Sequence, residues 1–477
     1  MALTKATYRM TQGQMVNVVD FGATGDGSTD DTDAIQAALT TGNDVFIPNG
    51  TYKVAIALSD CLKPVSNQKI VLEENATLSA IDSSNTLNAI FFLQDVNHVT
   101  IQGGKLVGDR AGHTGSGQEA HGFWLEDSDY VTIRDCHISD CWGDGIYTGN
   151  NPGHESEYLT IDNVVCDNNR RQGLSITTGR HIVVTNSYFI NTNGAAPSAG
   201  IDLENNSGTD VRDITIQGCV LKGNDGHGIA SGPNGTKNFR IIGCDIAENG
   251  LSGVSVNKVV DNVVINGNTI YDNAAHGVIL RGGGTSPYEM KGFIVSNNNI
   301  KSNDNHGIYI ADDIYDGIIT GNNIINNRWH GVIVEGYDTG RMVISCNNIY
   351  NNSQDTTNTY SGIYFGAFAR NHVVTNNSIT GSDHKYGIHV DNLESNVINN
   401  NQIQSASTAN TLIGYTSGQF TGNGLPLFYS TAAPTTGTWQ TNTIVLDNTP
   451  SAGGTIGWVC TSGGTPGTWK AFGTIAV

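Results

Sequence analysis

GIDLE, at residues 200–204, is one of eleven segments in which a glycine is followed by alternating apolar residues. The other copies are GFWLE, GIYTG, GLSIT, GIASG, GVSVN, GVILR, GIYIA, GVIVE, GIYFG and GIHVD, beginning at Gly122, Gly145, Gly173, Gly228, Gly253, Gly277, Gly307, Gly331, Gly362 and Gly387. Successive glycines are 23 to 31 residues apart, a period that fits neither a helical repeat of 33 or 34 residues nor a propeller blade. A unit this short cannot bury its own apolar face, so it must stack on its neighbours.

Many units contain a second alternating run, such as VTIRDCHI from Val131, ITIQGCVL from Ile214 and FRIIGCDI from Phe239. Alternation with period two, bounded by Asn, Asp and Gly, indicates short strands with one buried face. No helical period is found between Gly122 and about residue 400. Short strands without crossover helices predict an all-β, right-handed, single-stranded parallel β-helix, whose eleven coils would span about 50 Å at about 4.8 Å per coil.

The composition limits the possible partners. Lys and Arg total 24 against 44 Asp and Glu, so the formal net charge is −20. So acidic a protein is a poor candidate for binding nucleic acid or an anionic membrane through a basic patch. No apolar run is long enough to span a bilayer, and residues 1–18 lack the apolar region of a secretory signal. We therefore expect neither nucleic-acid binding nor membrane insertion. We also expect that the chain is delivered without a standard signal, as virion parts are, or that a leader was removed.

Cysteines and metal motifs point to no cofactor. Cys136, Cys219 and Cys244 occupy the same register in different coils, and Cys346 lies close to it, which predicts reduced thiols that fill the core. Only Cys136 and Cys141 approach the spacing of a metal pair. The sequence contains no nucleotide-binding GxxxxGK[ST] loop, HExxH helix or calcium-binding nonapeptide repeat.

The N-terminal segment has a different pattern. DFGATGDGSTDDTDAIQAAL, at residues 20–39, is expected to form an acidic glycine-rich loop and a short helix, with Ser28 and Asp31 as a capping box. This segment resembles the N-terminal signature of the pectate-lyase-like β-helix superfamily, found in phage tailspikes, polygalacturonase-like hydrolases and alginate epimerases. The resemblance implies that the segment caps one end of the β-helix and that Asp26, Asp30 and Asp31 are structural.

The repeat stops after about Thr416, and residues 425–477 are rich in Thr, Gly and Pro with short apolar runs and three tryptophans, Trp439, Trp458 and Trp469. This tail resembles the C-terminal β-modules of tailspikes and tail fibres, which implies trimerisation or glycan binding; a simple cap on the last coil is the alternative. The expected domains are an N-terminal cap at 1–60, the β-helix at 61–415 and a C-terminal β-module at 416–477.

The chemistry must be sought in side chains that point outward. In each glycine unit the second and fourth residues after the glycine face solvent, which selects Asp202 and Glu204 as a carboxylate pair flanked by coils with small residues. Alternate residues of one strand lie about 6.6 Å apart, a spacing that suits inverting glycoside hydrolysis. Two solvated surface acids are the simpler interpretation. The reserve catalytic candidates are Glu126, Asp144 and Glu335.

Exposed aromatic rings along the same face would pack against sugar rings. The candidate substrate-binding residues are Trp124, Tyr147, Tyr309 and Tyr364, with Arg171 and Arg281 for acidic groups. His precedes the glycine five times, at His121, His227, His276, His306 and His330, and we interpret these residues, like the asparagine runs, as ladders that serve the repeat.

Together these features predict a tailspike-like depolymerase that binds and cleaves a bacterial polysaccharide by glycoside hydrolysis with two carboxylates and no cofactor. We expect a homotrimer in the virion tail, with a secreted enzyme as the alternative location. A polysaccharide lyase or C5-epimerase acting on a uronate polymer is the first alternative function. A non-catalytic glycan-binding adhesin is the second.

Overall fold

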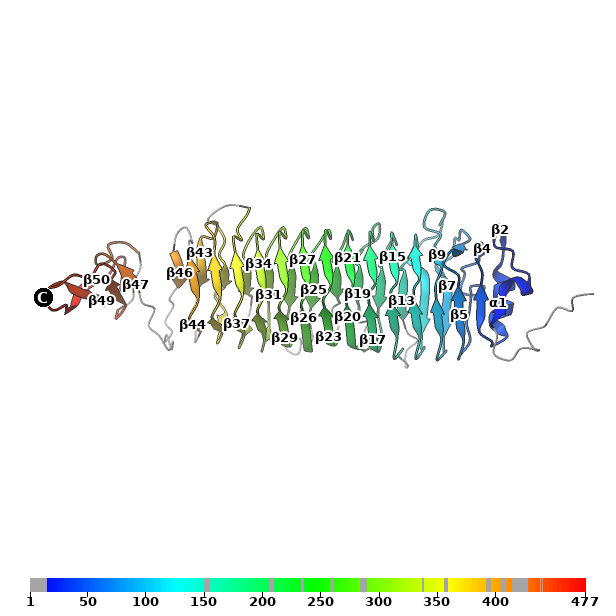
Figure 1. The fold of residues 1–477 in the computed structure, drawn as a ribbon, viewed down its shortest axis with the longest axis horizontal. Coiled ribbons are helices and arrows are strands. Elements are labelled where there is room, and N and C mark those ends of the chain that lie inside the picture. Colours follow the sequence, from blue (N-terminus) through cyan, green and yellow to red (C-terminus); the bar gives the residue numbers. More distant parts are fainter. Residues whose placement is uncertain are drawn as a thin grey trace, which may run out of the picture.

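The computed structural model describes residues 15–149, 155–205, 210–232, 236–258, 261–283, 290–336, 339–355, 359–391, 396–404, 409–413, 428–437, 439 and 441–477. Over this part the chain winds into a right-handed parallel β-helix of about 14 turns. Figure 1 shows the stacked strands forming a straight rod. Helix makes up only about 3% of the chain, as the absence of a helical period predicts, and no helix in the described ranges is long and apolar enough to cross a membrane.

Successive turns contribute strands to three long sheets in which neighbouring strands run parallel. The 13-stranded sheet, which carries the glycine units, contains β7 (Leu87–Gln94), β10 (Glu119–Glu126), β13 (Ile146–Gly149), β16 (Leu174–Ile176), β19 (Ile201–Leu203), β22 (Ile229–Ser231), β25 (Val254–Asn257), β28 (Val278–Arg281), β31 (Ile308–Ala311), β35 (Val332–Glu335), β39 (Ile363–Phe365), β43 (Tyr386–Val390) and β46 (Ala409–Ile413).

The 15-stranded sheet contains β2 (Asp26–Asp30), β4 (Gly50–Val54), β6 (Ala76–Ala80), β9 (Lys105–Val107), β12 (His137–Ser139), β15 (Val165–Asp167), β18 (Tyr188–Ile190), β21 (Val220–Lys222), β24 (Asp245–Ala247), β27 (Thr269–Tyr271), β30 (Asn299–Lys301), β34 (Asn323–Ile325), β38 (Asn348–Tyr350), β42 (Ser378–Thr380) and β45 (Gln402–Gln404). The 18-stranded sheet contains β1 (Val16–Asn17), β3 (Val45–Ile47), β5 (Lys69–Leu72), β8 (Thr100–Gln102), β11 (Thr132–Arg134), β14 (Thr160–Asp162), β17 (Gly179–Thr185), β20 (Val211–Gln217), β23 (Thr236–Ile242), β26 (Asp261–Asn266), β29 (Met290–Ser296), β32 (Ile314–Tyr315), β33 (Ile318–Thr320), β36 (Thr339–Gly340), β37 (Val343–Ser345), β40 (Ala369–Arg370), β41 (Val373–Thr375) and β44 (Val397–Asn399).

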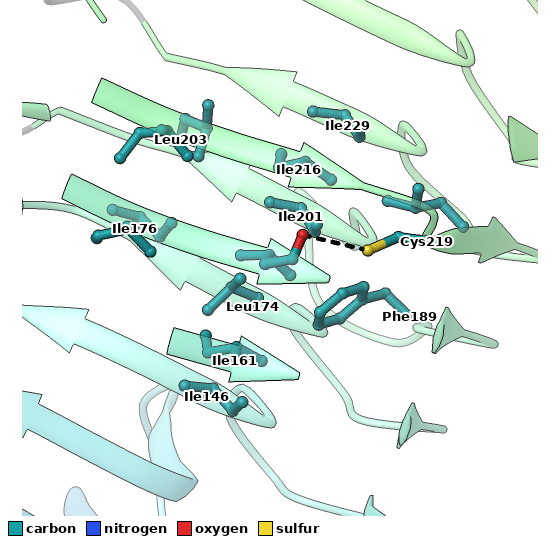
Figure 2. Close-up of a cluster of buried hydrophobic side chains, with 14 of the residues drawn as sticks. Ile146, Ile161, Leu174, Ile176, Phe189, Ile201, Leu203, Ile216, Cys219 and Ile229 are labelled. Carbon is teal, nitrogen blue, oxygen red and sulfur yellow. Dashed lines mark hydrogen bonds between the residues drawn. The ribbon is translucent and has the colours of Figure 1, made fainter. Parts of the chain in front are cut away.

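One continuous apolar core runs inside the rod from Val16 to Val390. Figure 2 shows its middle, where Ile146, Leu174 and Ile201 of successive glycine units stack above one another. The repeated glycine is required by close approach of the coils. A Cβ atom on Gly277, for example, would lie 2.5 Å from Cγ2 of Ile300 and 2.7 Å from the carbonyl oxygen of Gly307.

Two ladders of asparagines, all buried except Asn401, join the coils, as the sequence predicts. In each ladder the side-chain Nδ2 donates to Oδ1 of the asparagine in the next coil at 2.8 to 3.0 Å. The first ladder is Asn224, Asn249, Asn273, Asn303, Asn327 and Asn352, and the second is Asn268, Asn298, Asn322, Asn347, Asn377 and Asn401. These amides satisfy polar groups that the turns would otherwise leave unpaired in the core.

The histidines before the glycines also serve the repeat. Nδ1 of His306 accepts a hydrogen bond of 3.1 Å from the backbone N–H of His330, and Nδ1 of His330 accepts one of 2.8 Å from Ser361. The rings of His276, His306 and His330 stack with centroids 5.2 and 5.3 Å apart. Burial lowers the pKa of His306 to about 2, because a charged imidazole is poorly solvated there.

The N-terminal segment closes one end of the rod (Figure 1), with the 3₁₀-helix η2 (Val18–Phe21) and helix α1 (Thr32–Thr40). Ile35 and Leu39 of α1 are fully buried in the core cluster. The expected capping box is wrong: Ser28 lies in β2, and Asp31 is the N-cap but makes no side-chain cap hydrogen bond. Its carboxylate instead accepts hydrogen bonds from the backbone N–H groups of the preceding loop, at Thr24 and Gly25.

The eight cysteines are free thiols; seven are buried and Cys346 is exposed. A small C-terminal sheet contains β47 (Phe428–Ser430), β48 (Ile444–Asp447), β49 (Thr455–Ser462) and β50 (Thr468–Thr474). β47 and β48 are parallel, and the other pairings are antiparallel. The rings of Trp439 and Trp469 meet edge to face at 5.2 Å. The expected domain boundary at residue 416 lies outside the described residues.

Candidate functional site

The carboxylates of Asp202 and Glu204 lie on the outer face of the 13-stranded sheet. Ile201 and Leu203 of β19 point into the core and are fully buried, so the residues that alternate with them point outward. Asp202 is in register with Ser175 of β16 on one side and Ala230 of β22 on the other. Small neighbours thus flank the pair in both adjacent coils, as the sequence predicts.

Asp202 is much more buried than an outward position suggests, with only 4% of its surface exposed. Its Oδ2 accepts a hydrogen bond of 2.9 Å from Nε2 of Gln172, which lies in the turn before β16. Burial first and the nearby charge of Glu204 second raise the pKa of Asp202 to about 7, against the opposing effects of Arg171 and the Gln172 hydrogen bond. Burial is therefore a larger cause of the raised pKa than the like charge of Glu204.

Arg171 is the cation of the site. Its Nη2 lies 3.3 Å from Oε2 of Glu204, and its Nη1 lies 3.1 Å from Oδ2 of Asp144. Nε donates a 2.9 Å hydrogen bond to Oε1 of Gln118. Arg171 is therefore held between two carboxylates from coils on either side of its own.

Asp144 is fully buried, and burial is the main cause of its raised pKa. Its backbone N–H donates to Nδ1 of His121 at 3.0 Å, and Nε2 of His121 lies 2.8 Å from Oε2 of Glu119. The His121 hydrogen bond is the main cause of the lowered pKa of Glu119. We call Glu119, Asp144, Arg171, Asp202 and Glu204 the acid cluster: four carboxyl groups around one guanidinium.

Trp124 differs from its expected role as an exposed platform. It is 7% exposed and packs with Cys61, Ala89 and Phe92 in a second small core. Its indole N–H donates to Oε1 of Glu126 at 3.0 Å. Bulky residues in the adjacent coil cover the ring. The position of Trp124 in the repeat does not by itself reveal this burial.

The tyrosines are half-buried and engaged with neighbours. Tyr147 stacks on His121 at 4.7 Å. The hydroxyl of Tyr309 donates to Oε1 of Glu335 at 2.8 Å, and burial raises the pKa of Tyr309 to about 12. The hydroxyl of Tyr364 donates to Oδ2 of Asp391 at 2.6 Å. These rings share one sheet face, as predicted, but form separate polar pairs.

The structure brings Asp144 and Arg171 to the Asp202 and Glu204 pair and leaves the other candidates apart. Glu126 belongs to β10, three strands along the sheet from β19, and binds Gln94. Glu335 belongs to β35, and Arg281 belongs to β28. Within the described ranges, no group of three or more His, Cys, Asp and Glu side chains is placed to hold a metal ion.

Sequence reasoning missed the wall beside the acid cluster. The segment between β9 and β10 folds over the turn before β16, where the carbonyl oxygen of Gly117 accepts a 3.1 Å hydrogen bond from the indole N–H of Trp142. The ring of Trp142 lies between His113, at 4.6 Å, and the guanidinium of Arg170, at 3.8 Å. This segment is longer than its counterpart in most coils, and that extra length is the sequence signal that could have indicated the wall.

Comparisons with known proteins agree with this fold. The model of the family described as right-handed beta helix region matches residues 66–240 and 199–354. The uncharacterized protein YclG of Bacillus subtilis strain 168 is 27% identical over 379 residues, which cover 65% of this chain and 62% of YclG. The pre-neck appendage protein of Bacillus phage B103 is 29% identical over 238 residues, 38% of this chain and 26% of that protein.

Among solved structures, the pre-mature gene product 12 of bacteriophage phi29 superposes with a TM-score of 0.55 at 18% identity, covering 87% of this chain and 59% of that chain. This likeness concerns the fold. The chain spans less than two thirds of the length of each of these three proteins.

Proposed function

The chain belongs to the right-handed β-helix family, and from that premise we propose that it is a phage tail depolymerase that binds and hydrolyses a bacterial surface polysaccharide. The relationship to a phage pre-neck appendage protein supports a place in the virion; a secreted enzyme is the alternative. The observation that carries the proposal is a buried carboxyl group, Asp202, with a pKa of about 7, beside a second carboxylate, Glu204.

In the proposed reaction Asp202 is the general acid. Its proton passes to the glycosidic oxygen as the bond to the anomeric carbon breaks, and Glu204 accepts a proton from the water that attacks this carbon. Glu204 is more open to water, with 37% of its side chain exposed. Gln172 and Arg171 hold the two carboxyl groups in place. Spacing by two residues on one face favours inversion over a covalent intermediate.

The charge of the acid cluster favours hydrolysis over elimination or epimerisation. A lyase or C5-epimerase must neutralise a uronate carboxylate next to the carbon that loses its proton. The nearest guanidinium, Arg171, already faces Asp144 and Glu204. A uronate at this point would meet uncompensated like charge.

Digestion of a panel of bacterial polysaccharides, with mass analysis of the products, tests the proposal. New reducing ends without an ultraviolet-absorbing double bond are expected. Products with that double bond would indicate a lyase instead, and retained binding without cleavage would indicate an adhesin.

We also propose a homotrimer. A column of apolar side chains, in register from strand to strand, lies on the outer face of the 18-stranded sheet. The column consists of Val264, Ile294, Ile318, Val343 and Val373. Ile294 and Ile318 are 36% and 39% exposed, and a contiguous apolar stripe of this kind is typical of an association surface. The C-terminal module at 416–477 remains the second proposed contact, through trimerisation or glycan binding.

A further inference from the structure

A second polar site lies on the same sheet face, next to the acid cluster. It is a surface pocket of about 440 Å³ at the ends of β22, β25 and β28, lined by Ser231, Gly232, Asn257, Lys258, Arg281, Gly282, Gly283 and Asp312. Gly232 adjoins Glu204: a Cβ atom placed on Gly232 would lie 3.1 Å from Cα and 3.3 Å from Cγ of Glu204. The pocket is therefore continuous with the proposed catalytic face.

Missing side chains open the pocket. Gly232 stands where the fourth position of neighbouring units carries Glu204 and Asn257. A Cβ atom on Gly282 would lie 2.2 Å from the carbonyl oxygen of Asp312, so only glycine fits at that wall.

The pocket carries two cationic side chains, Lys258 and Arg281, against one carboxylate, Asp312. Both cationic residues are exposed, and no carboxylate in the described part of the chain forms an ion pair with either, although Arg281 also lies at hydrogen-bond distance from Tyr309. Six other arginines of the rod lie within ion-pair distance of carboxylates, namely Arg134, Arg171, Arg180, Arg212, Arg328 and Arg341. On a chain with a net charge of −20, two cationic residues against one carboxylate make this pocket locally positive.

The backbone at Lys258 has a special conformation and is bonded to that of Arg281. Lys258 has φ of 63°, a left-handed conformation that is uncommon for residues other than glycine. Its N–H donates a 2.6 Å hydrogen bond to the carbonyl oxygen of Arg281 in the next coil. This contact ties the two cationic residues to each other.

We propose that this pocket is an anion-binding subsite, which receives a carboxylate, sulfate or phosphate group carried by the polysaccharide. Lys258 and Arg281 belong to the second and third glycine units beyond the unit of Asp202, which places the subsite about 10 to 14 Å along the rod from Asp202 at about 4.8 Å per coil. The guanidinium supplies paired N–H donors for two anionic oxygens.

This inference rests on the proposed function and refines it. The polysaccharide is uncharged at the bond that is cleaved, where the acid cluster repels anions, and carries its negative charge on a sugar bound two to three coils away. A polymer with an anionic group on every sugar would be excluded by the cluster.

The test measures binding of three small probes to the full chain at low salt by saturation-transfer NMR: methyl glucuronide, glucose 6-sulfate and methyl glucoside. At least one anionic probe should bind about five-fold or more tightly than the glucoside. Lys258→Gln and Arg281→Gln should each weaken that binding by about five-fold. Arg240→Gln, an exposed arginine on the 18-stranded sheet, is the matched control and should leave it unchanged.

Equal binding of the glucoside and both anions, or full anion binding by Arg281→Gln, would overturn the proposal. Preference for methyl glucuronide would identify a carboxylate as the anionic group that the pocket receives. Preference for glucose 6-sulfate would identify a sulfate ester. Asp202→Asn separates the two proposals, because it should keep anion binding while losing cleavage. Cleavage that survives in Asp202→Asn refutes the catalytic assignment and leaves the subsite standing.

Discussion

Arg171 holds Glu204 from the neighbouring coil, with Nη2 3.3 Å from Oε2. The two residues are 33 positions apart in the chain, and only the stacking of β16 on β19 brings them together. Because Arg171 also lies 3.1 Å from Asp144, the cation is shared, and Asp202 keeps a raised pKa although a guanidinium is close.

Asp202→Asn and Glu204→Gln should each lower turnover by about 10²-fold or more, because each removes one of the two proton transfers. Glu335→Gln, a carboxylate on the same sheet face that pairs with Tyr309, is the control and should retain activity. The rate of release of reducing ends is the measurement. Normal activity in the first two variants would mean that the pair is only surface.

Asp202→Asn should also change stability with pH. The folded-state pKa of about 7 lies above the unfolded value near 3.8, so the carboxyl group contributes stability at low pH that is lost as pH rises through 7. At pH 8 the variant should be more stable than the wild type, by up to on the order of 4 kcal/mol, and at pH 4 this advantage should vanish. Urea unfolding at the two pH values measures the difference; a constant difference would contradict the assigned pKa.

Activity should decline as pH rises above about 7, where Asp202 loses its proton. Arg171→Gln removes a charge that stabilises the ionised carboxylate, so the alkaline limb of kcat/KM should move to higher pH by about one unit. Arg171→Lys keeps the positive charge and should move it less. An alkaline limb at the same pH in all three proteins would exclude Asp202 as the titrating acid.

The buried asparagine ladder should dominate the stability of the coils. Asn347 is 1% exposed, and its amide bonds Asn322, Asn377 and the carbonyl oxygen of Ile319. Asn347→Ala would leave these partners unsatisfied in the core and should cost on the order of 3 kcal/mol. Asn348→Ala, the next residue, on the exposed face of β38, should cost under about 0.5 kcal/mol. The free energy of unfolding of both variants is measured by chemical denaturation. Similar losses in the two variants would refute the distinction between the buried and the exposed asparagine.

Lateral association should depend on the apolar column. Replacing Ile294 and Ile318 together by Lys should reduce the molar mass measured by light scattering from trimer to monomer, because charged side chains cannot be buried in the contact. Val183→Lys, equally exposed at 39% on the same sheet but outside the column, should leave the trimer intact. A monomeric wild type, or a trimeric double variant, would disprove the interface. Truncation after Thr416 then measures the contribution of the C-terminal module.

Local pattern determined much of this protein before any contact was known. Period-two alternation after Gly200 and its ten counterparts specifies which side chains enter the core, because one face of each strand must be buried. The same rule placed Asp202 and Glu204 on the outer face, and the recurrence of asparagine and histidine at one position indicated ladders. These features depend on residues a few positions apart, whose relative geometry the strand itself sets.

Tertiary structure alone decided what surrounds the outward residues. Trp124 is covered by Phe92, and Arg171 reaches Glu204, because stacking places residues about one coil apart in the chain within contact distance. The length and path of each turn set these meetings, and they vary from coil to coil. Burial of Asp202, and therefore its pKa, follows from such contacts across coils, since desolvation depends on every atom that surrounds a carboxyl group and not on its place in a repeat.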